Sequence, residues 1–456
     1  MASTYLNRTI GSSSTLSTKA TISFWVKKSL TDSSTNFYGI LSSNGGWDNG
    51  SGFAIGWRED LLVWYNLANG TGYRTYTNRK FRDTSAFYHI VYKIDTTQAS
   101  MQDRVTLYVN GEDQGDLTSN TSIANAMPSQ NGNLYYFLDN GDTCQIGRGG
   151  NAGSTYFNGS MTHFHFIDGT AYDADTFGEI DSVSGNWKAK TSPSVTYGNN
   201  GFFIKGENSS ALGTDSSGRG NNFTVNGTPT QTIDTPSNVF ATLNPLHFGS
   251  DVGTVTMSNG NLTFSNSGSD SWRPSTQAVS SGKYYAEFKT TGVTGAGGVG
   301  INSGALTGYT GSGAYDYVYL GNGIVYNNDN NQGGTFASPS TNDIIGVAVD
   351  LDNNKIYFSI NGTFQNSADP TSGATGTGAI AVADPSSNGT GVYHFSVGDA
   401  GSGTVSFQAN FGNGFFGTTA VASAQNPDDG IGIFEHDVPT GYRALCTKSI
   451  NAQEYS

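Results

Sequence analysis

The sequence lacks the features that identify several large classes of protein. Its 456 residues include two cysteines, Cys144 and Cys446, too few for a disulfide framework or a thiolate metal cage. Charged residues amount to 13%, where about a quarter is usual, while aromatic residues reach 12%. Disordered chains show the reverse balance. No hydrophobic run approaches the roughly 18 residues that a membrane-spanning helix needs, so we expect no membrane insertion.

Basic residues are scarce as well. The chain carries 22 Lys and Arg against 36 Asp and Glu, a formal net charge of −14. The imbalance is uneven, because residues 1–245 hold 16 basic and 20 acidic groups, whereas residues 246–456 hold 6 and 16. An acidic surface repels a phosphate backbone, so we expect no nucleic acid among the partners.

The sequence does contain many short segments rich in β-branched and aromatic residues, separated by turns of Gly, Asn, Asp and Ser. These segments are residues 20–26, 53–57, 61–65, 88–94 and 105–109 in the first half, and 283–289, 343–350, 392–397 and 405–411 in the second. Short strands at this spacing predict a β-sandwich or barrel. Only residues 173–180 have a helix-like pattern.

Two hairpins are clear from the sequence. Arg104–Gly111 and Lys355–Gly362 each alternate apolar with other residues and end in Asn-Gly, which tolerates the positive φ of a type I′ turn. Between them, residues 234–245 contain two prolines, which stop central strands. We therefore predict an all-β fold of two tandem antiparallel β-sandwich (jelly-roll) domains, residues 1–240 and 241–456.

Five segments of the first half carry a family pattern. They are Ile22–Val26, Phe87–Tyr92, Leu107–Gly111, Phe157–Gly159 and Phe164–Asp168. Together they resemble the concanavalin A-like, laminin G type lectin fold over about residues 3–169. The resemblance implies a lectin-type sandwich whose last strand leads into a short helix at residues 171–180.

A different pattern marks the second half. It is carried by Gly282–Phe288, Gly298–Ile301, Asp343–Asp350 and Ile356–Gly362. These segments resemble a SPRY domain, another bent β-sandwich. The second domain is therefore expected to be SPRY-like.

The pairing of these two domains is similar to virion-surface and tail-fibre proteins of marine bacteriophages. That resemblance implies a non-catalytic virion component, a tail-fibre tip or surface adhesin that binds host-surface glycans or other receptors during adsorption. It places the chain on the virion surface, at the tail or the capsid exterior, with other virion proteins as partners. By analogy with phage fibres, it implies a homotrimer.

Three other functions remain open. The first is a capsid decoration or structural protein of the phage head, and the second is a protein-interaction module, because SPRY domains bind peptides. The third is a glycoside hydrolase of the same fold, whose motif is Glu-x-Asp-x-x-Glu. Here Glu179 and Asp181 match the first two carboxylates, but Ser184 stands at the third position. Hydrolysis requires two carboxyl groups that flank the bond, so we expect no enzyme.

Glycan binding requires aromatic faces together with amide or carboxylate groups. In the first half, the candidates lie in a turn-rich stretch: Trp47, Trp64, Tyr65, Asn66, Tyr73 and Tyr76. In the second half, the candidates lie in a glycine-rich stretch, and the SPRY resemblance implies ligand binding through loops at one rim. These candidates are Tyr309, Tyr315, Tyr317 and Asn322. Packing within the core is the alternative role for each aromatic residue.

One turn could bind calcium. Asp139 and Asp142 offer carboxylate oxygens in the segment Asp-Asn-Gly-Asp, and calcium prefers such ligands. The resemblance would place an acid soon after residues 157–159, but Met161 and Thr162 stand there. The alternative is an Asx-rich turn that satisfies its own backbone, and we expect no other cofactor.

Overall fold

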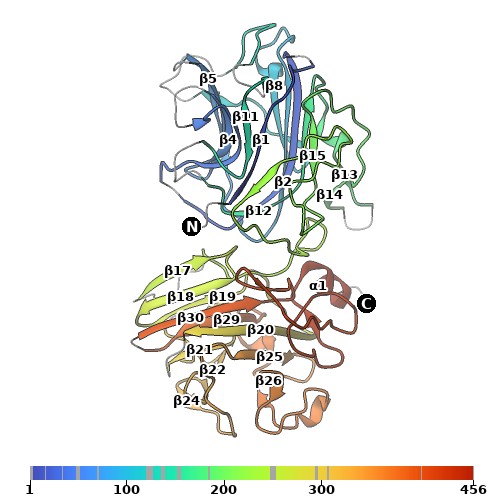
Figure 1. The fold of residues 1–456 in the computed structure, drawn as a ribbon. Helices are drawn as coiled ribbons and strands as arrows, with labels where there is room; N and C mark the ends of the chain where they lie inside the picture. Colours follow the sequence, from blue (N-terminus) through green and yellow to red (C-terminus); the bar gives the residue numbers. More distant parts are fainter. Residues whose placement is uncertain are drawn as a thin grey trace. The chain divides into compact units, whose positions relative to one another are not determined.

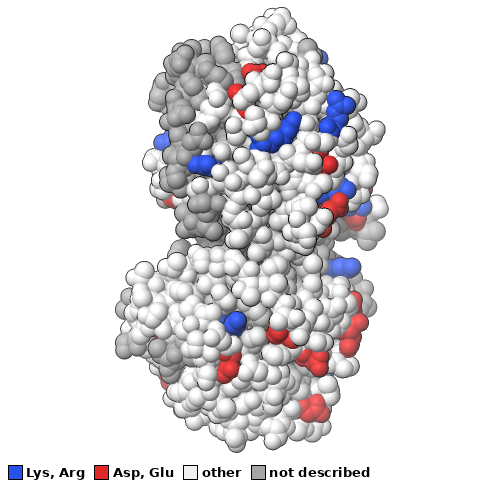
Figure 2. Space-filling view, viewed as in Figure 1, with Lys and Arg blue, Asp and Glu red and all other residues white. Residues whose placement is uncertain are grey.

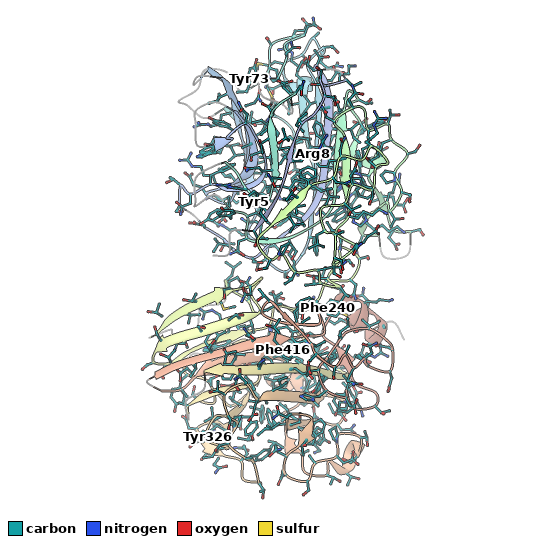
Figure 3. The ribbon with its side chains drawn as sticks, viewed as in Figure 1. Tyr5, Arg8, Tyr73, Phe240, Tyr326 and Phe416 are labelled. Carbon is teal, nitrogen blue, oxygen red and sulfur yellow. The ribbon has the colours of Figure 1, made fainter. Side chains whose placement is uncertain are left out.

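The computed structural model divides the chain into two compact units. It describes residues 4–15, 17–32, 34–47, 52–68, 71–119, 127–134, 139–150, 156–182, 185–246, 253–292, 296–305, 308–401 and 403–454. The units are Met1–Gln231 and Thr232–Ser456, so the division lies ahead of the expected boundary at residues 240/241. Phe240 (Figure 3) and Leu243 belong to hydrophobic clusters of the second unit.

The first unit is a sandwich of two antiparallel sheets (Figure 1, blue to green). Its strands are β1 (Tyr5–Thr9), β2 (Lys19–Lys28), β3 (Tyr38–Ser43), β4 (Gly52–Arg58), β5 (Leu61–Ala68), β6 (Thr71–Lys80), β7 (Tyr88–Asp95), β8 (Val105–Val109), β9 (Glu112–Asp113), β10 (Thr118–Ser119), β11 (Thr143–Ile146), β12 (Gly159–Asp168), β15 (Phe202–Ile204) and β16 (Thr224–Asn226). One sheet runs β10-β6-β5-β4-β3-β11-β1-β16 and the other β15-β12-β2-β7-β8-β9.

Side chains that point inward at alternate positions of the strands form the main core of this unit. Ile22, Phe24 and Val26 of β2 lie in it, and so do Leu107 and Val109 of β8. In β8, every second residue is buried, as a strand with one face against the core requires. The two sheets therefore bury one common apolar layer.

The second unit is also built from two main antiparallel sheets (Figure 1, yellow to red). Its strands are β17 (Thr254–Ser258), β18 (Thr263–Gly268), β19 (Ser271–Pro274), β20 (Lys283–Gly292), β21 (Gly297–Asn302), β22 (Asp316–Leu320), β23 (Val325–Asn327), β24 (Asn330–Asn331), β25 (Ile344–Asp350), β26 (Lys355–Ile360), β27 (Thr363–Phe364), β28 (Ile380–Ala381), β29 (His394–Asp399), β30 (Gly403–Asn410), β31 (Phe415–Phe416), β32 (Thr419–Ala420) and β33 (Arg443–Ala444). The larger sheet follows β17-β18-β30-β20-β25-β26-β27, and the other follows β19-β29-β21-β22-β23-β24. Acidic side chains are scattered over the face of this unit drawn in Figure 2.

The predicted all-β class and the two tandem sandwiches are confirmed. Both Asn-Gly hairpins are present as well. Asn110 and Gly111 have φ of 51° and 82°, and Asn361 and Gly362 have φ of 48° and 79°, as a type I′ turn requires at both central positions.

The helix expected at residues 171–180 is wrong. A short 3-10 turn, Ala174–Thr176, is followed instead by β13 (Gly178–Ile180), which pairs with β14 (Trp187–Ala189). An added Cβ at Gly178 would lie 2.4 Å from the Trp187 ring, so glycine allows the two strands to pack closely. The helix α1 (Thr447–Glu454) has no counterpart among the elements expected from the sequence.

No helix within the described ranges is both long and apolar enough to cross a bilayer.

Candidate functional site

A shallow pocket in the first unit has an interior volume of about 10 Å³, room for about one water molecule, and opens into a depression of about 270 Å³ that includes open solvent. Its walls come from the end of β2, the start of β3, the end of β4 and the turn between β4 and β5. The lining residues are Lys28, Leu30, Asp32, Tyr38, Trp57, Arg58, Asp60 and Asn158. Charged and hydroxyl groups therefore converge beside one indole ring.

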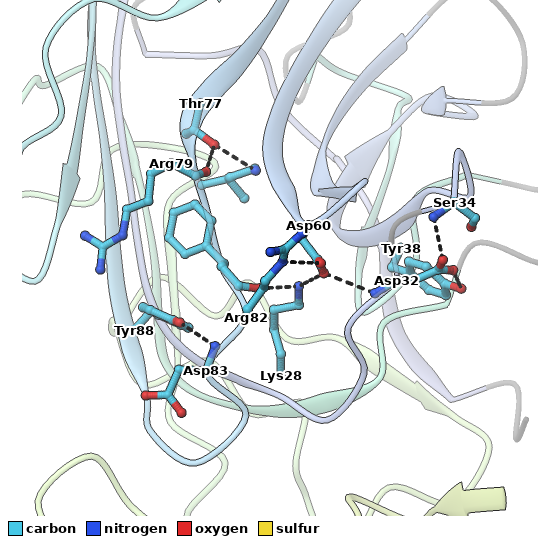
Figure 4. A network of polar contacts seen from close by, with 12 residues as sticks. Lys28, Asp32, Ser34, Tyr38, Asp60, Thr77, Arg79, Arg82, Asp83 and Tyr88 are labelled. Carbon is cyan, nitrogen blue, oxygen red and sulfur yellow. Dashed lines mark hydrogen bonds and ion pairs between the residues drawn. The ribbon is translucent and has the colours of Figure 1, made fainter. Parts of the chain in front are cut away.

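A buried ion pair forms the back of this pocket (Figure 4). Asp60 lies in the β4–β5 turn at φ 62° and accepts hydrogen bonds from Lys28 Nζ at 3.0 Å and Arg82 Nε at 3.2 Å. The Lys28 and Asp60 side chains are each 4% exposed. Burial lowers the pKa of Lys28, and the Asp60 carboxylate counteracts only part of that effect. Lys28 Nζ also donates to the Phe81 carbonyl at 2.8 Å, which fixes its position.

Asp32 and Tyr38 form a second polar pair in the pocket. The Tyr38 hydroxyl donates to Asp32 Oδ2 at 2.5 Å, and the Ser34 backbone N–H donates to Oδ1 at 2.7 Å. Burial raises the pKa of Asp32, but these hydrogen bonds outweigh it and bring the pKa to about 2. Burial and the Asp32 hydrogen bond raise the pKa of Tyr38 to about 12. At neutral pH, the pocket thus presents a carboxylate and a neutral phenol.

Next to the pocket, Phe37, Trp47, Tyr65 and Tyr76 form what we name the aromatic cluster. The half-buried Trp47 ring stacks on Phe37, with centroids 4.4 Å apart and planes 5° apart. The Tyr65 ring is 5.1 Å from Trp47. The cluster is separate from the main core of the first unit, so it lies on the opposite face of the sheet.

Two arginines accompany the aromatic cluster. The Arg58 guanidinium lies 5.5 Å from the Trp47 centroid and donates to the Tyr76 hydroxyl at 2.9 Å. Since Arg58 also lines the pocket, it joins the two features into one site. The Arg74 guanidinium lies 4.7 Å from the Trp47 centroid and 5.2 Å from that of Tyr65.

The structure brings three of the six predicted residues of the first half together: Trp47, Tyr65 and Tyr76. Trp64 is 1% exposed in the main core, and Asn66 is fully buried. Because side chains alternate along β5, these two lie on the face opposite to Tyr65. Tyr73, labelled in Figure 3, stands opposite Asn66 in the strand register and is also buried. The expectation that Trp64, Asn66 and Tyr73 contact a glycan is therefore incompatible with their burial. Tyr65 and Tyr76 are only 1% and 7% exposed, so among the six residues the half-buried Trp47 is the one that offers ring surface to a ligand.

The tyrosines predicted in the second half are engaged within their own unit. Tyr317 is 5% exposed, and its hydroxyl accepts from the Ala383 backbone N–H at 2.9 Å. Tyr309 donates to Asp329 Oδ1 at 2.5 Å, and Tyr315 donates to the Ser387 carbonyl at 2.6 Å. Tyr317 is thus a core residue, contrary to the predicted binding role. Tyr309, Tyr315 and the exposed Asn322 stay predictions.

The carboxylates of the turn predicted to bind calcium accept hydrogen bonds from the turn itself and from a neighbouring strand. Asp142 Oδ2 accepts from the Asp139 backbone N–H at 3.1 Å and from the Ser43 hydroxyl at 3.2 Å. The described part of the chain contains no group of three or more His, Cys, Asp or Glu that could hold a metal ion. Burial raises the pKa of both carboxyls, although hydrogen bonds from neighbouring groups oppose the shift. This donor set fits calcium poorly, and calcium binding here stays a prediction.

A comparison with protein-family models supports the lectin-type fold expected for the first unit. Residues 3–175 match the laminin G type family model described as the concanavalin A-like lectin/glucanases superfamily. No curated protein matches the chain.

Three of the solved structures that match parts of the chain are the following. The SPRY domain of human HERC1 is 16% identical and the match covers 37% of this chain and 96% of that one, with a TM-score of 0.29. A heptameric SAP-like pentraxin from Limulus polyphemus is 13% identical, and the match covers 41% of this chain and 86% of that one, with a TM-score of 0.28. A candidate carbohydrate-binding protein from Bacteroides ovatus is 17% identical, and the match covers 51% of this chain and 59% of that one, with a TM-score of 0.34.

Proposed function

We propose that the chain is a non-catalytic carbohydrate-binding protein that holds a sugar between the pocket and the aromatic cluster of its first unit. The observation that carries the proposal is Arg58, which lines the pocket and also contacts Trp47 and Tyr76. Trp47 is the half-buried ring of the cluster and can contact the apolar face of a sugar, and the Asp32 carboxylate can accept hydrogen bonds from its hydroxyls. Such a mixture of apolar surface and few fixed polar groups is typical of small-ligand sites.

The finer role that we propose is attachment of a bacteriophage to its host. In this role, the chain is a tail-fibre tip or surface adhesin, assembled as a homotrimer on other virion proteins. The resemblance of the paired domains to virion-surface proteins supports it. Gold-labelled antibodies against the chain should mark the tails of purified particles. Label confined to the head would contradict this role and favour capsid decoration.

A glycoside hydrolase is the competing function, and the positions of the acids count against it. Lys188 Nζ lies 3.5 Å from Glu179 Oε1 and 2.9 Å from Asp181 Oδ2, so one lysine holds both carboxylates of the partial motif. Ser184 lies outside the described residues. In the pocket, Asp32 has a pKa of about 2, whereas the general acid of a glycosidase must hold a proton. These observations favour binding without hydrolysis.

Hydrolysis is open to direct measurement. We expect no release of reducing ends from β-glucans by the purified chain, because Asp32 is held as a carboxylate and Asp60 is paired with Lys28 and Arg82. Activity that disappears in both the Glu179→Gln and the Asp181→Asn variants would contradict this expectation. It would identify the partial motif as an active site.

Truncation of Trp47 tests the proposed binding site. Trp47→Ala should weaken the strongest glycan interaction at least tenfold, because aromatic anchors of binding sites cost more than about 1.4 kcal/mol when they are removed. Trp47→Phe should retain most of the affinity, since it keeps a flat ring. Isothermal titration with the best ligand from a glycan array provides the measurement.

A surface substitution outside the pocket serves as the control. Ile180 is 63% exposed in the first unit, and Ile180→Ala should leave glycan affinity unchanged. If Trp47→Ala binds as tightly as the unmodified chain, with an unchanged circular dichroism spectrum, the proposed site is wrong.

A further inference from the structure

We infer that the sugar bound at the aromatic cluster carries an anionic group, a carboxylate or a sulfate, and that Arg74 binds this group. The inference rests on the proposed function and names the ligand class of the same site. The observations that carry it are the position of Arg74, the lack of an acidic partner for it among the described residues, and the geometry of its stacking.

The register of the sheet sets the position of Arg74. It stands on β6 opposite Tyr65 of β5, so its side chain shares the face of the aromatic cluster. The guanidinium stacks over Trp47 and Tyr65 at 4.7 and 5.2 Å. Stacking covers the face of a guanidinium but leaves its N–H groups directed outward in the plane. Arg74 is half-buried, so these donors are held beside the site.

Arg74 differs from the other cations around the pocket. Lys28 and Arg82 share Asp60, and Arg58 has Glu59 at 3.9 Å in addition to its hydrogen bond to Tyr76. Among the described residues, no ion pair or hydrogen bond of Arg74 is present, and its buried Nε has no hydrogen-bond partner. Nε itself is shielded from solvent, whereas the terminal Nη groups are not among the buried atoms without a partner. The Nη groups are therefore the donors that an anionic ligand group would meet.

The chemistry of the guanidinium selects the ligand. Its fork of N–H donors matches the paired oxygens of a carboxylate or sulfate, and hydrogen bonds to ionised groups are the stronger ones. The chain as a whole is strongly acidic, at −14, and repels densely charged polymers at long range. The expected ligand is therefore an oligosaccharide with an isolated acidic group next to neutral sugars.

A glycan array with matched neutral, carboxylated and sulfated members tests the inference. The unmodified chain should prefer acidic members over their neutral counterparts at least tenfold, and the two acidic arms identify which anion is preferred. Arg74→Gln should reduce this preference at least tenfold, measured as the ratio of acidic to neutral binding by the same variant. Raising the NaCl concentration should reduce the preference in the same way.

The control removes a different cation from the same strand. The Arg79 guanidinium lies 5.6 Å from the Phe81 centroid and 6.0 Å from that of Tyr88, and Arg79→Gln should keep the preference for acidic sugars. Equal or stronger binding of neutral members, or an unchanged preference in Arg74→Gln, would overturn the inference but leave the proposed function intact. If no member binds, both fail.

Discussion

Replacing Asp60 with asparagine is expected to destabilise the first unit by about 3 kcal/mol or more. The substitution leaves the Lys28 ammonium in a site where its side chain is 4% exposed, without the carboxylate that balances it. Removing one partner of a buried ion pair leaves an uncompensated charge, which is why the cost is large. Asparagine tolerates positive φ, so the turn at Asp60, with φ of 62°, is kept. The effect therefore reports the lost charge.

Urea unfolding followed by tryptophan fluorescence measures this effect. Arg82 provides the matched control, because it also binds Asp60 but its side chain is 57% exposed. Arg82→Gln should cost less than about 1 kcal/mol, as exposed ion pairs do. The double variant Lys28→Met, Asp60→Asn should regain part of the stability lost in Asp60→Asn. A loss below about 1 kcal/mol in Asp60→Asn would show that the buried pair does not stabilise the unit.

The sequence was sufficient to predict the strands and hairpins, because these depend on local features. Asn110-Gly111 and Asn361-Gly362 define their turns by backbone preference alone. The period of two along each strand also separates residues into two faces. The same local reasoning failed at residues 173–180, where the pairing of Glu179 with Lys188 overrides a helix-like pattern.

The candidate site was only partly predictable, because local pattern does not tell which face of a strand is covered. Trp64 and Tyr65 are neighbours of the same type, yet one lies in the main core and the other in the aromatic cluster. Both faces of β5 carry apolar residues, so hydrophobicity alone did not show which face lies in the main core. The buried ion pair was missed entirely. Lys28, Asp60 and Arg82 are far apart in the sequence, and no spacing rule connects them.

The two units are expected to respond to pH in opposite directions. In the first unit, burial lowers the pKa of His89 to about 3 and that of His165 well below its usual value. His89 Nδ1 accepts a hydrogen bond from Trp187 Nε1 at 2.9 Å, which requires a neutral ring nitrogen. The unfolded chain binds protons at these histidines near pH 6.5, but the folded unit does not. Its stability is therefore present above about pH 6.5 and is lost as the pH falls.

Buried carboxyl groups produce the opposite dependence in the second unit. Burial raises the pKa of Glu287 to about 7 and that of Asp316 to about 8. Asp316 Oδ1 has no hydrogen-bond partner within the described residues, which favours the protonated form. The folded unit keeps protons that the unfolded chain releases near pH 4. The stability from these groups is thus complete below about pH 4 and is lost as the pH rises toward 8. His436 has the opposite effect on the pH dependence of stability, because burial lowers its pKa. The unfolded chain therefore binds a proton at His436 more readily than the folded unit does.

Differential scanning calorimetry of the whole chain between pH 5 and 8 measures both responses. Each proton contributes about 1.4 kcal/mol per pH unit, so two transitions should move in opposite directions, by several degrees for each kcal/mol. Asp316→Asn removes a titrating group and should reduce the pH dependence of only one transition. His89→Gln should do the same for the other, which assigns each transition to a unit. If both midpoints fall together as the pH decreases from 8 to 5, Glu287 and Asp316 do not hold protons in the folded second unit, since bound protons would stabilise it at the lower pH.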